Sequence, residues 1–228
     1  MKKLLISSSL CAATFLSAQI DFSSTRYGLT GGATYSRVSH AHNPSGPRFS
    51  GYGGILALIP VDNNDQFYLQ PGVEFLSAGE SGKDKEKKQF PGYNAVYANN
   101  YISVPVYFKG YFSEAESEFF AMAGPKFNFL INQKVSGDAP QIYTVEGADF
   151  VDADGNTYNV NGKAASFNFA VGVGLGFSYK RQLEITARYD FGVSDTYKGL
   201  KRELGADPNI QKRKSEQILS VGLSYIFE

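Results

Sequence analysis

Hydrophobic and polar residues alternate with a period of two in the segment 100–112, which reads NYISVPVYFKGYF. One set of alternate positions is apolar and includes Ile102, Val104 and Phe108. The other set is polar or amphipathic, with several tyrosines and Lys109. Because successive side chains of a β-strand point to opposite faces, the segment predicts a strand with one apolar and one polar face.

Similar alternation predicts eight strands in all. They are expected near residues 25–36, 48–60, 66–78, 99–112, 118–131, 164–180, 182–194 and 215–227. The second is the weakest, because GYGGILALIP mixes the two faces. The polar faces combine full charges with many glycines, such as Gly172, Gly174 and Gly222. A soluble sandwich could also alternate, but its solvent faces would usually carry more Lys, Glu and Thr. Small residues suit the crowded interior of a barrel.

The connections between these expected strands alternate in length. In chain order they cover residues 37–47, 61–65, 79–98, 113–117, 132–163, 181 and 195–214, so that long and short connections take turns. Outer-membrane barrels combine short periplasmic turns with long external loops. A closed barrel also satisfies its backbone hydrogen bonds internally, as lipid requires. The sequence therefore predicts an all-β, eight-stranded antiparallel up-and-down transmembrane β-barrel. Its apolar face meets lipid, Lys109 faces the lumen, and both termini are periplasmic.

The N-terminus is typical of a signal peptide. MKK is followed by a short apolar run, and LSAQ offers small residues before a cut between Ala18 and Gln19. The alternative, an anchor helix, is disfavoured because the apolar run is shorter than the ~20 residues that span a bilayer. The expected domains are therefore a signal peptide at 1–18 and an outer-membrane β-barrel at 19–228. Cleavage removes Cys11, the one cysteine, so the mature chain is expected to lack thiols and disulfides.

Six charged residues fall on the inward faces of the expected strands and form a predicted lumen polar network. They are Glu74, Lys109, Lys126, Glu184, Arg188 and Asp190. Eight strands leave an interior that side chains can just fill, and isolated charges there are costly. We therefore expect paired charges that fill the lumen and leave no open pore. Glu184 and Arg188 lie four residues apart on one strand and are expected to bond across strands; the individual pairings stay open.

Two loops contain patterns that resemble metal sites. His40 and His42 form a His-x-His pair, but further ligands are not visible nearby, so a polar exposed loop is the favoured interpretation. The segment VDADGNTYNV resembles part of a calcium loop through Asp152, Asp154 and Asn156, but it lacks the required glutamate. Asp154-Gly155 instead predicts a hairpin beyond the bilayer. No metal, cofactor or catalytic site is expected.

Two other loops are charged. Both charged segments lie in long connections: GKDKEKKQ and KRELGADPNIQKRK. A solvated loop is the favoured interpretation of each, and contact with lipopolysaccharide is the alternative. Lysine and arginine together number 22, as do the acidic residues, so a strongly basic nucleic-acid surface is not expected.

Several motifs resemble one known family. YISVPVYFKGYF, followed by FFAMAGPKFNFLI, is similar to paired strands of the PorT-type outer-membrane β-barrel family of Gram-negative bacteria. AVGVGLGFSY, LEITARYDFGVSD and SVGLSYIF resemble the last three strands of that family. The resemblance covers nearly the whole mature chain and implies a scaffold without a catalytic site. Some relatives are linked to secretion and gliding machinery, but nothing in this chain indicates that subgroup.

The expected function is therefore that of an integral outer-membrane barrel with a filled polar lumen and a structural or loop-mediated binding role. It is not expected to be an enzyme. The alternatives are a barrel-rim enzyme acting on lipid or peptide, and a small channel. Expected partners are outer-membrane lipid, the barrel-insertion machinery and lipopolysaccharide, with no nucleic acid, and the expected oligomeric state is a monomer.

Overall fold

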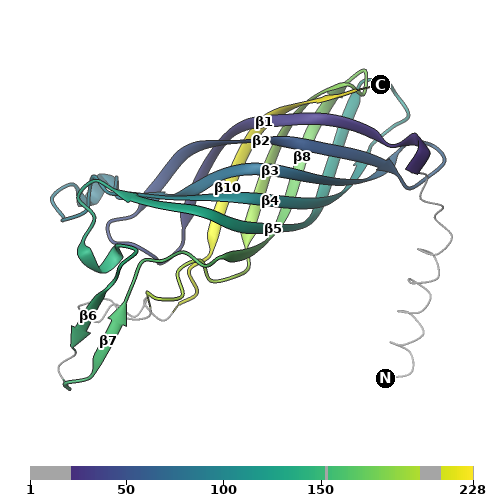
Figure 1. Cartoon of the computed structure of the whole chain (residues 1–228). Helices are drawn as coiled ribbons and strands as arrows, with labels where there is room; N and C mark the ends of the chain where they lie inside the picture. The colour runs from purple at the N-terminus through teal and green to yellow at the C-terminus, as the bar shows by residue number, and fades with distance from the viewer. Residues whose placement is uncertain (1–21, 152–153, 201–211, 228) are drawn as a thin grey trace, which may run out of the picture.

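The computed structural model describes residues 22–151, 154–200 and 212–227 (Figure 1). Eight of its strands close into one barrel, and two short strands form a separate sheet. The barrel strands are β1 (Arg26–Val38), β2 (Gly46–Pro60), β3 (Phe67–Ser81), β4 (Val96–Tyr111), β5 (Glu118–Ser136), β8 (Phe167–Tyr179), β9 (Leu183–Gly192) and β10 (Glu216–Ile226). The expected strands fall on these eight, with boundaries that differ by a few residues.

Every neighbouring pair of barrel strands is antiparallel, in the order β1-β10-β9-β8-β5-β4-β3-β2. The barrel closes where β1 pairs with β10, from Gly28↔Ile226 to Val38↔Glu216. The predicted fold class, an eight-stranded antiparallel up-and-down barrel, is confirmed. In this circular order β3 and β9 lie four positions apart, on opposite sides of the lumen.

The apolar faces point outward, as the alternation predicts. In β4, Phe108 is 50% exposed whereas the adjacent Lys109 is 0% exposed. Exposed Phe, Leu, Ile, Val and Tyr side chains recur along the other strands, including Phe75, Leu175 and Leu223. A band of this kind suits lipid and would be costly in water. No helix in the described residues is long and apolar enough to cross a membrane.

The lumen is less uniformly polar than expected. A cluster of buried apolar and aromatic side chains fills the part nearest the short turns: Leu56, Leu58, Tyr68, Tyr107, Tyr111, Phe120, Met122 and Ile226. This cluster explains the mixed pattern of β2, whose Leu56 and Leu58 point inward. Farther along, Leu76, Tyr101 and Ile218 pack in a second cluster. Apolar packing therefore fills much of the lumen, and the charged side chains lie within it.

The described parts of the long connections form a cap at the other end of the barrel. It includes η2 (Lys85–Lys87), η3 (Gln141–Tyr143) and a hairpin of β6 (Ala148–Val151) and β7 (Thr157–Val160), while η1 (Phe22–Ser24) precedes β1. The hairpin predicted around Asp154-Gly155 is confirmed. The expected exposed loop is wrong for His42, which is 6% exposed, because the first loop packs into an aromatic cluster; His40 is exposed.

Candidate functional site

The lumen holds a four-membered ionic layer that joins three strands. Arg188 on β9 donates from Nη1 to Glu74 Oε1 at 3.0 Å and from Nη2 to Glu74 Oε2 at 3.1 Å. Lys126 on β5 donates to Asp190 Oδ2 at 2.7 Å and lies 3.5 Å from Glu74 Oε2. Tyr107 completes the layer by donating to Asp190 Oδ1 at 3.3 Å. Two cations balance two carboxylates, so the layer is neutral overall.

The fork between Arg188 and Glu74 spans the barrel, because β9 and β3 lie on opposite sides of the lumen. Bidentate pairs of this type fix both distance and orientation. The guanidinium also lies over two aromatic rings, with its Cζ 4.9 Å from the centroid of Tyr52 and 5.4 Å from that of Tyr107. The layer therefore crosses the whole lumen.

A second ion pair lies closer to the short turns. Lys109 Nζ donates to the two carboxylate oxygens of Glu184 at 2.5 and 2.6 Å, and Tyr111 donates its hydroxyl to Glu184 at 2.7 Å. The ammonium also lies 4.0 Å from the ring centroid of Phe120. Glu184 and Arg188 thus bond partners on other strands. All six charged residues singled out in the sequence lie in the lumen and are at most 5% exposed.

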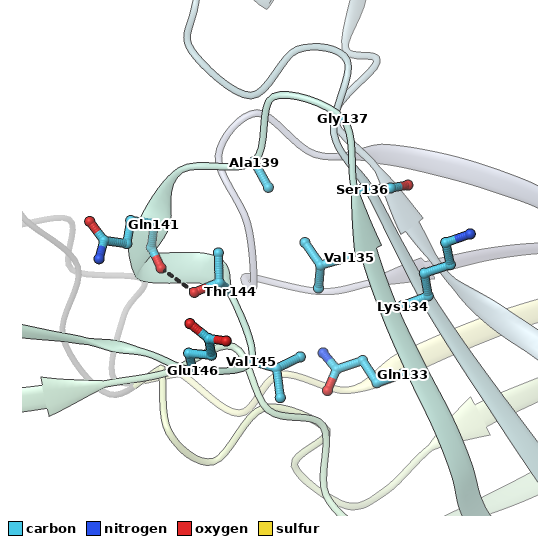
Figure 2. A pocket seen from close by; sticks show the side chains of 10 residues that line it. All are labelled: Gln133, Lys134, Val135, Ser136, Gly137, Ala139, Gln141, Thr144, Val145 and Glu146. Carbon is cyan, nitrogen blue, oxygen red and sulfur yellow. Dashed lines mark hydrogen bonds between the residues drawn. The ribbon is translucent and has the colours of Figure 1, made fainter.

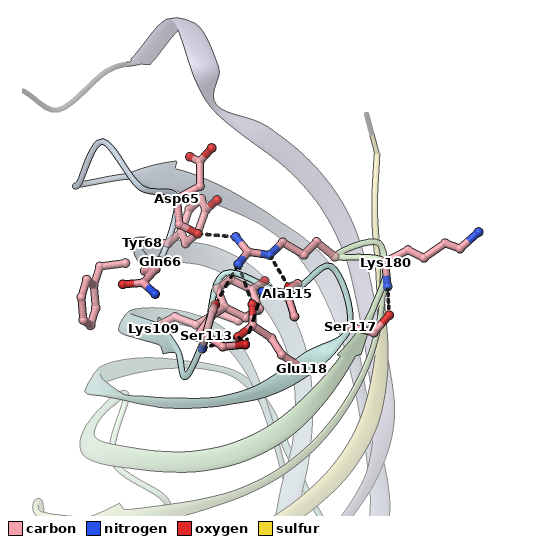
Figure 3. A network of polar contacts seen from close by, with 12 residues as sticks. Asp65, Gln66, Tyr68, Lys109, Ser113, Ala115, Ser117, Glu118 and Lys180 are labelled. Carbon is pink, nitrogen blue, oxygen red and sulfur yellow. Dashed lines mark hydrogen bonds and ion pairs between the residues drawn. The ribbon is translucent and has the colours of Figure 1, made fainter.

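Arg181 joins the turns at the short-turn end, and its partners Asp65, Ser113, Ala115 and Glu118 are labelled in Figure 3. It lies in the β8–β9 turn at a φ of 50° and forms an ion pair with Glu118 at 2.5 Å. The same guanidinium donates to the backbone oxygens of Asp65, Ser113 and Ala115, so one side chain joins all three short turns. Partial burial lowers the pKa of Arg181, but the bond to Glu118 and its charge outweigh burial, so the pKa lies above its usual value.

A cluster of buried aromatic residues supports the opposite, long-loop end. The His42 ring stacks on Tyr97 with centroids 3.6 Å apart and meets the edges of Tyr143 and Tyr197 at 4.9 and 4.8 Å. These rings come from the first, third and fourth long connections and from β4. Asn99 donates to the Tyr197 hydroxyl at 2.9 Å, and burial raises the pKa of Tyr197 well above its usual range. The described parts of the long loops therefore pack together.

Glu80 joins this cluster to the barrel wall. His42 Nδ1 contacts one carboxylate oxygen of Glu80, and Ser45 Oγ donates to the other. A serine nucleophile needs a hydrogen bond to its base, usually a histidine. Here both side chains bond the same carboxylate, and all three residues are buried. The arrangement suits a tie between the first loop and β3 better than acyl-transfer chemistry.

A groove of about 530 Å³ lies beside the last residues of β5, where the strand is paired only with β4 (Figure 2). Residues 133–137 form one wall, and the connection through η3 forms the other, with Thr144, Val145 and Glu146. Gly137, at a φ of 79°, turns the chain from the strand toward η3. A side chain could not replace it, because a Cβ would lie 2.3 Å from the Asn94 backbone oxygen.

The residues of the two metal-like sequence patterns do not form a metal site in the described structure. Within the described ranges, no three His, Cys, Asp or Glu side chains are placed to hold a metal ion. Asp154 lies in the tip of the β6–β7 hairpin, while Asp152 falls outside the described residues. The basic second loop is solvated, as expected, with Lys83, Lys85 and Lys88 exposed. Most of the basic fourth loop and the expected signal peptide lie outside the described residues.

Several residues of these clusters were not predicted from the sequence. Glu80 and Glu216 are buried carboxylates near the long-loop ends of β3 and β10. Tyr197 is fully buried although it lies in a connection. The period-two pattern could have indicated the inward position of Glu80, because it continues the face of Glu74. No local signal places Tyr197, whose neighbours lie far away in the sequence.

Comparison with known proteins identifies a family and related folds. Residues 17–198 match the family described as outer membrane protein beta-barrel domain. The search of curated proteins finds no match. Among solved structures, the chain is similar to Ail, the attachment invasion locus protein of Yersinia pestis, at 11% identity and a TM-score of 0.42, over 89% of this chain and 98% of that one.

Two further structures give a similar picture. Neisserial surface protein A matches at 11% identity and a TM-score of 0.43, over 89% of this chain and 97% of that one. The N-terminal β-barrel domain of Pseudomonas aeruginosa OprF matches at 11% identity and a TM-score of 0.36, over 88% and 97%. Structural similarity at this level supports no statement about the function of this chain. The family match covers most of the chain, which therefore belongs to the outer membrane protein beta-barrel domain family and is an integral outer-membrane protein.

Proposed function

We propose that this protein is a closed membrane scaffold that binds a partner through its long loops. The observation that carries the proposal is the fork from Arg188 to Glu74 across the full width of the lumen. Lys126 and Asp190 fill the space beside it, and buried aromatic rings pack above and below. A lumen filled in this way leaves recognition to the loops, which the cluster around His42 holds in a packed cap.

The proposal also includes the orientation of the barrel in the membrane, its subfamily and its partners. The long loops face the outside and the short turns and both termini face the periplasm, which the alternation of connection lengths supports. The strand motifs support a PorT-type member from a Gram-negative bacterium, exported by a signal peptide cut after residue 18. Such a barrel meets outer-membrane lipid and the barrel-insertion machinery, and it works as a monomer. The exposed lysines of 83–88 support contact with lipopolysaccharide phosphates.

We further propose that the protein is not an enzyme. A barrel-rim enzyme needs a nucleophile and base that substrate can reach. The candidate trio of His42, Ser45 and Glu80 is buried, and its serine and histidine share one carboxylate. Its geometry supports a role in holding the loop cap.

Conductance across planar lipid bilayers tests the closed lumen. Purified full-length mature protein should show no large, stable, porin-like conductance, although its gel mobility should change on heating as a folded barrel's does. Porin-like conductance from heat-modifiable protein would refute the closed scaffold and favour the channel. The matched comparison is the Arg188→Ala variant, which removes the cross-lumen fork and so should raise conductance relative to wild type if that fork closes the lumen.

A further inference from the structure

The end of β5 offers an unpaired strand edge. β5 pairs with β4 up to Ser136↔Val96, but its pairing with β8 stops at Phe129↔Phe167. Past that point, Leu130 still donates its backbone N–H to Ser166 at 2.8 Å. Then the Gln133 side chain bonds Gly162 and Ala164 at 2.5 and 2.7 Å, in place of a neighbouring strand. Beyond Gln133, the described chain places no strand on this side of β5.

The groove of Figure 2 runs along this edge. Five consecutive residues, 133–137, line one wall. The face of a strand would contribute every second residue, so a consecutive run indicates that the backbone itself borders the groove. Alternate residues of a strand direct their N–H and C=O groups to each side, so about half of these groups face the groove. The opposite wall contributes Thr144 and Val145, whose side chains can contact a chain lying between the walls.

We infer that this groove binds an extended peptide segment of a partner protein, which adds to β5 as a further strand. The inference rests on the proposed loop-mediated binding and deepens it by naming the site and the class of partner. Strand addition obtains affinity from main-chain hydrogen bonds and selectivity from side chains next to the edge. The edge beyond the Gln133 contacts, from 134 to 136, can pair with about three residues of an added segment, or roughly 10 Å of strand.

Charged residues along the groove determine which peptide segments can bind there. Lys134 is the first residue of the open edge and is exposed, and Glu146 is exposed on the opposite wall. Neither forms a salt bridge within the described parts of the chain. Opposite charges across paired strands stabilise the pairing, whereas like charges weaken it. The segment therefore places an acidic residue beside Lys134, and Glu146 disfavours a second acidic residue across the groove.

A lysine on an edge strand can also protect that edge from pairing with another copy. A second copy of this chain is therefore the main competing occupant, and lipopolysaccharide bound by Lys134 is another. Lipopolysaccharide carries no row of backbone N–H donors, so N-methylation of a peptide distinguishes it from the proposed occupant. A second copy would pair through its own backbone donors, and crosslinking between copies distinguishes it.

The probe is a seven-residue synthetic peptide of alternating valine and threonine with one central glutamate. Its binding to folded mature protein in lipid nanodiscs is measured by fluorescence anisotropy. We expect saturable binding that Lys134→Glu weakens about threefold to tenfold and that a peptide with central lysine restores in that variant. The same peptide N-methylated at alternate amides should bind at least about tenfold more weakly, since it lacks donors for the edge. Lys163→Glu, at an exposed site outside the groove lining, is the matched control and should bind as wild type does.

Several results would overturn the inference: absence of saturable binding, equal binding of the N-methylated peptide, or equal effects of Lys134→Glu and Lys163→Glu. Disulfide-linked homodimers of a Ser136→Cys variant in intact membranes would assign the edge to a second copy instead. Lipopolysaccharide binding that Lys134→Glu abolishes, without peptide binding, would assign it to lipid. If the peptide does not bind and the barrel does not conduct, only this inference is refuted. Porin-like conductance would refute the proposed function itself.

Discussion

Replacement of Arg188 by alanine tests the physical basis of the filled lumen. Arg188 gives Glu74 two hydrogen bonds, at 3.0 and 3.1 Å, and its Nε lies 3.5 Å from Asp190. Without it, two buried carboxylates share the single ammonium of Lys126, which lies 2.7 Å from Asp190 and 3.5 Å from Glu74. The layer then carries one uncompensated negative charge in a space of low dielectric.

The expected loss of stability follows from that charge. Removal of one partner of a buried ion pair typically costs about 3–5 kcal/mol, because the other partner stays buried and unpaired. Arg188→Ala should therefore lower the free energy of unfolding by about 3–5 kcal/mol. The double variant Arg188→Met with Glu74→Met removes the charges together and leaves the Lys126–Asp190 pair balanced. It should recover most of that loss, since apolar replacement of a whole buried pair is often neutral.

Urea unfolding in phospholipid vesicles measures these differences. Tryptophan is absent from the sequence, so far-ultraviolet circular dichroism and the heat-dependent gel shift provide the signals. Lys163→Ala, at an exposed position, is the control and should change stability by less than about 0.5 kcal/mol. If Arg188→Ala matched this control, or if the double variant were as unstable as the single one, a stranded charge could not be the cause.

Three further predictions concern other parts of the barrel. Arg181→Ala should destabilise the barrel by about 1–2 kcal/mol in the same urea assay and Arg181→Lys should rescue it only in part, because lysine lacks the fork that joins this turn to the other two; full rescue would argue against this role. Gly172→Val should cost more than about 2 kcal/mol or prevent folding, since a Cβ there would lie 2.6 Å from Asp190 Oδ1; a wild-type urea midpoint would contradict the crowding. Asp154→Cys should react with an impermeant maleimide on whole cells and Asn63→Cys should not, and the reverse result would invert the proposed orientation.

The barrel could be predicted from the sequence because its main signals are local. Each strand shows its own period-two alternation, and the lengths of the connections distinguish loops from turns. β5 continues to Ser136 although the alternation predicted its end near 131. Beyond the barrel wall, β5 has a partner only in β4. Asn132 and Lys134 are exposed there, and the half-buried face carries the polar Gln133 before Val135 packs against the loop cluster. Alternation fades there, so the sequence contains no clear signal for the strand or for its open edge.

The lumen pairings depend on closure of the barrel, which no local pattern encodes. Alternation indicated that Glu74 and Arg188 face inward, but their meeting requires that β3 and β9 be opposite and that their registers match in height. Local sequence patterns predict the loop cap even less well. His42 is buried because Tyr143 and Tyr197, from two other connections, surround it. From the sequence alone, its loop could only be interpreted as polar and exposed.

Tyrosine on the inward faces accounts for the departure from a purely ionic lumen. The chain has 15 tyrosines, and several of the largest buried side chains are tyrosines of β3 and β4. A tyrosine ring fills volume as phenylalanine does, while its hydroxyl can satisfy a buried carboxylate. Tyr107 and Tyr111 do both, since each packs in the apolar cluster and donates a hydrogen bond to an acid of an ion pair. Ion pairs can therefore persist between apolar layers, because the aromatic neighbours supply the hydrogen bonds that burial would otherwise remove.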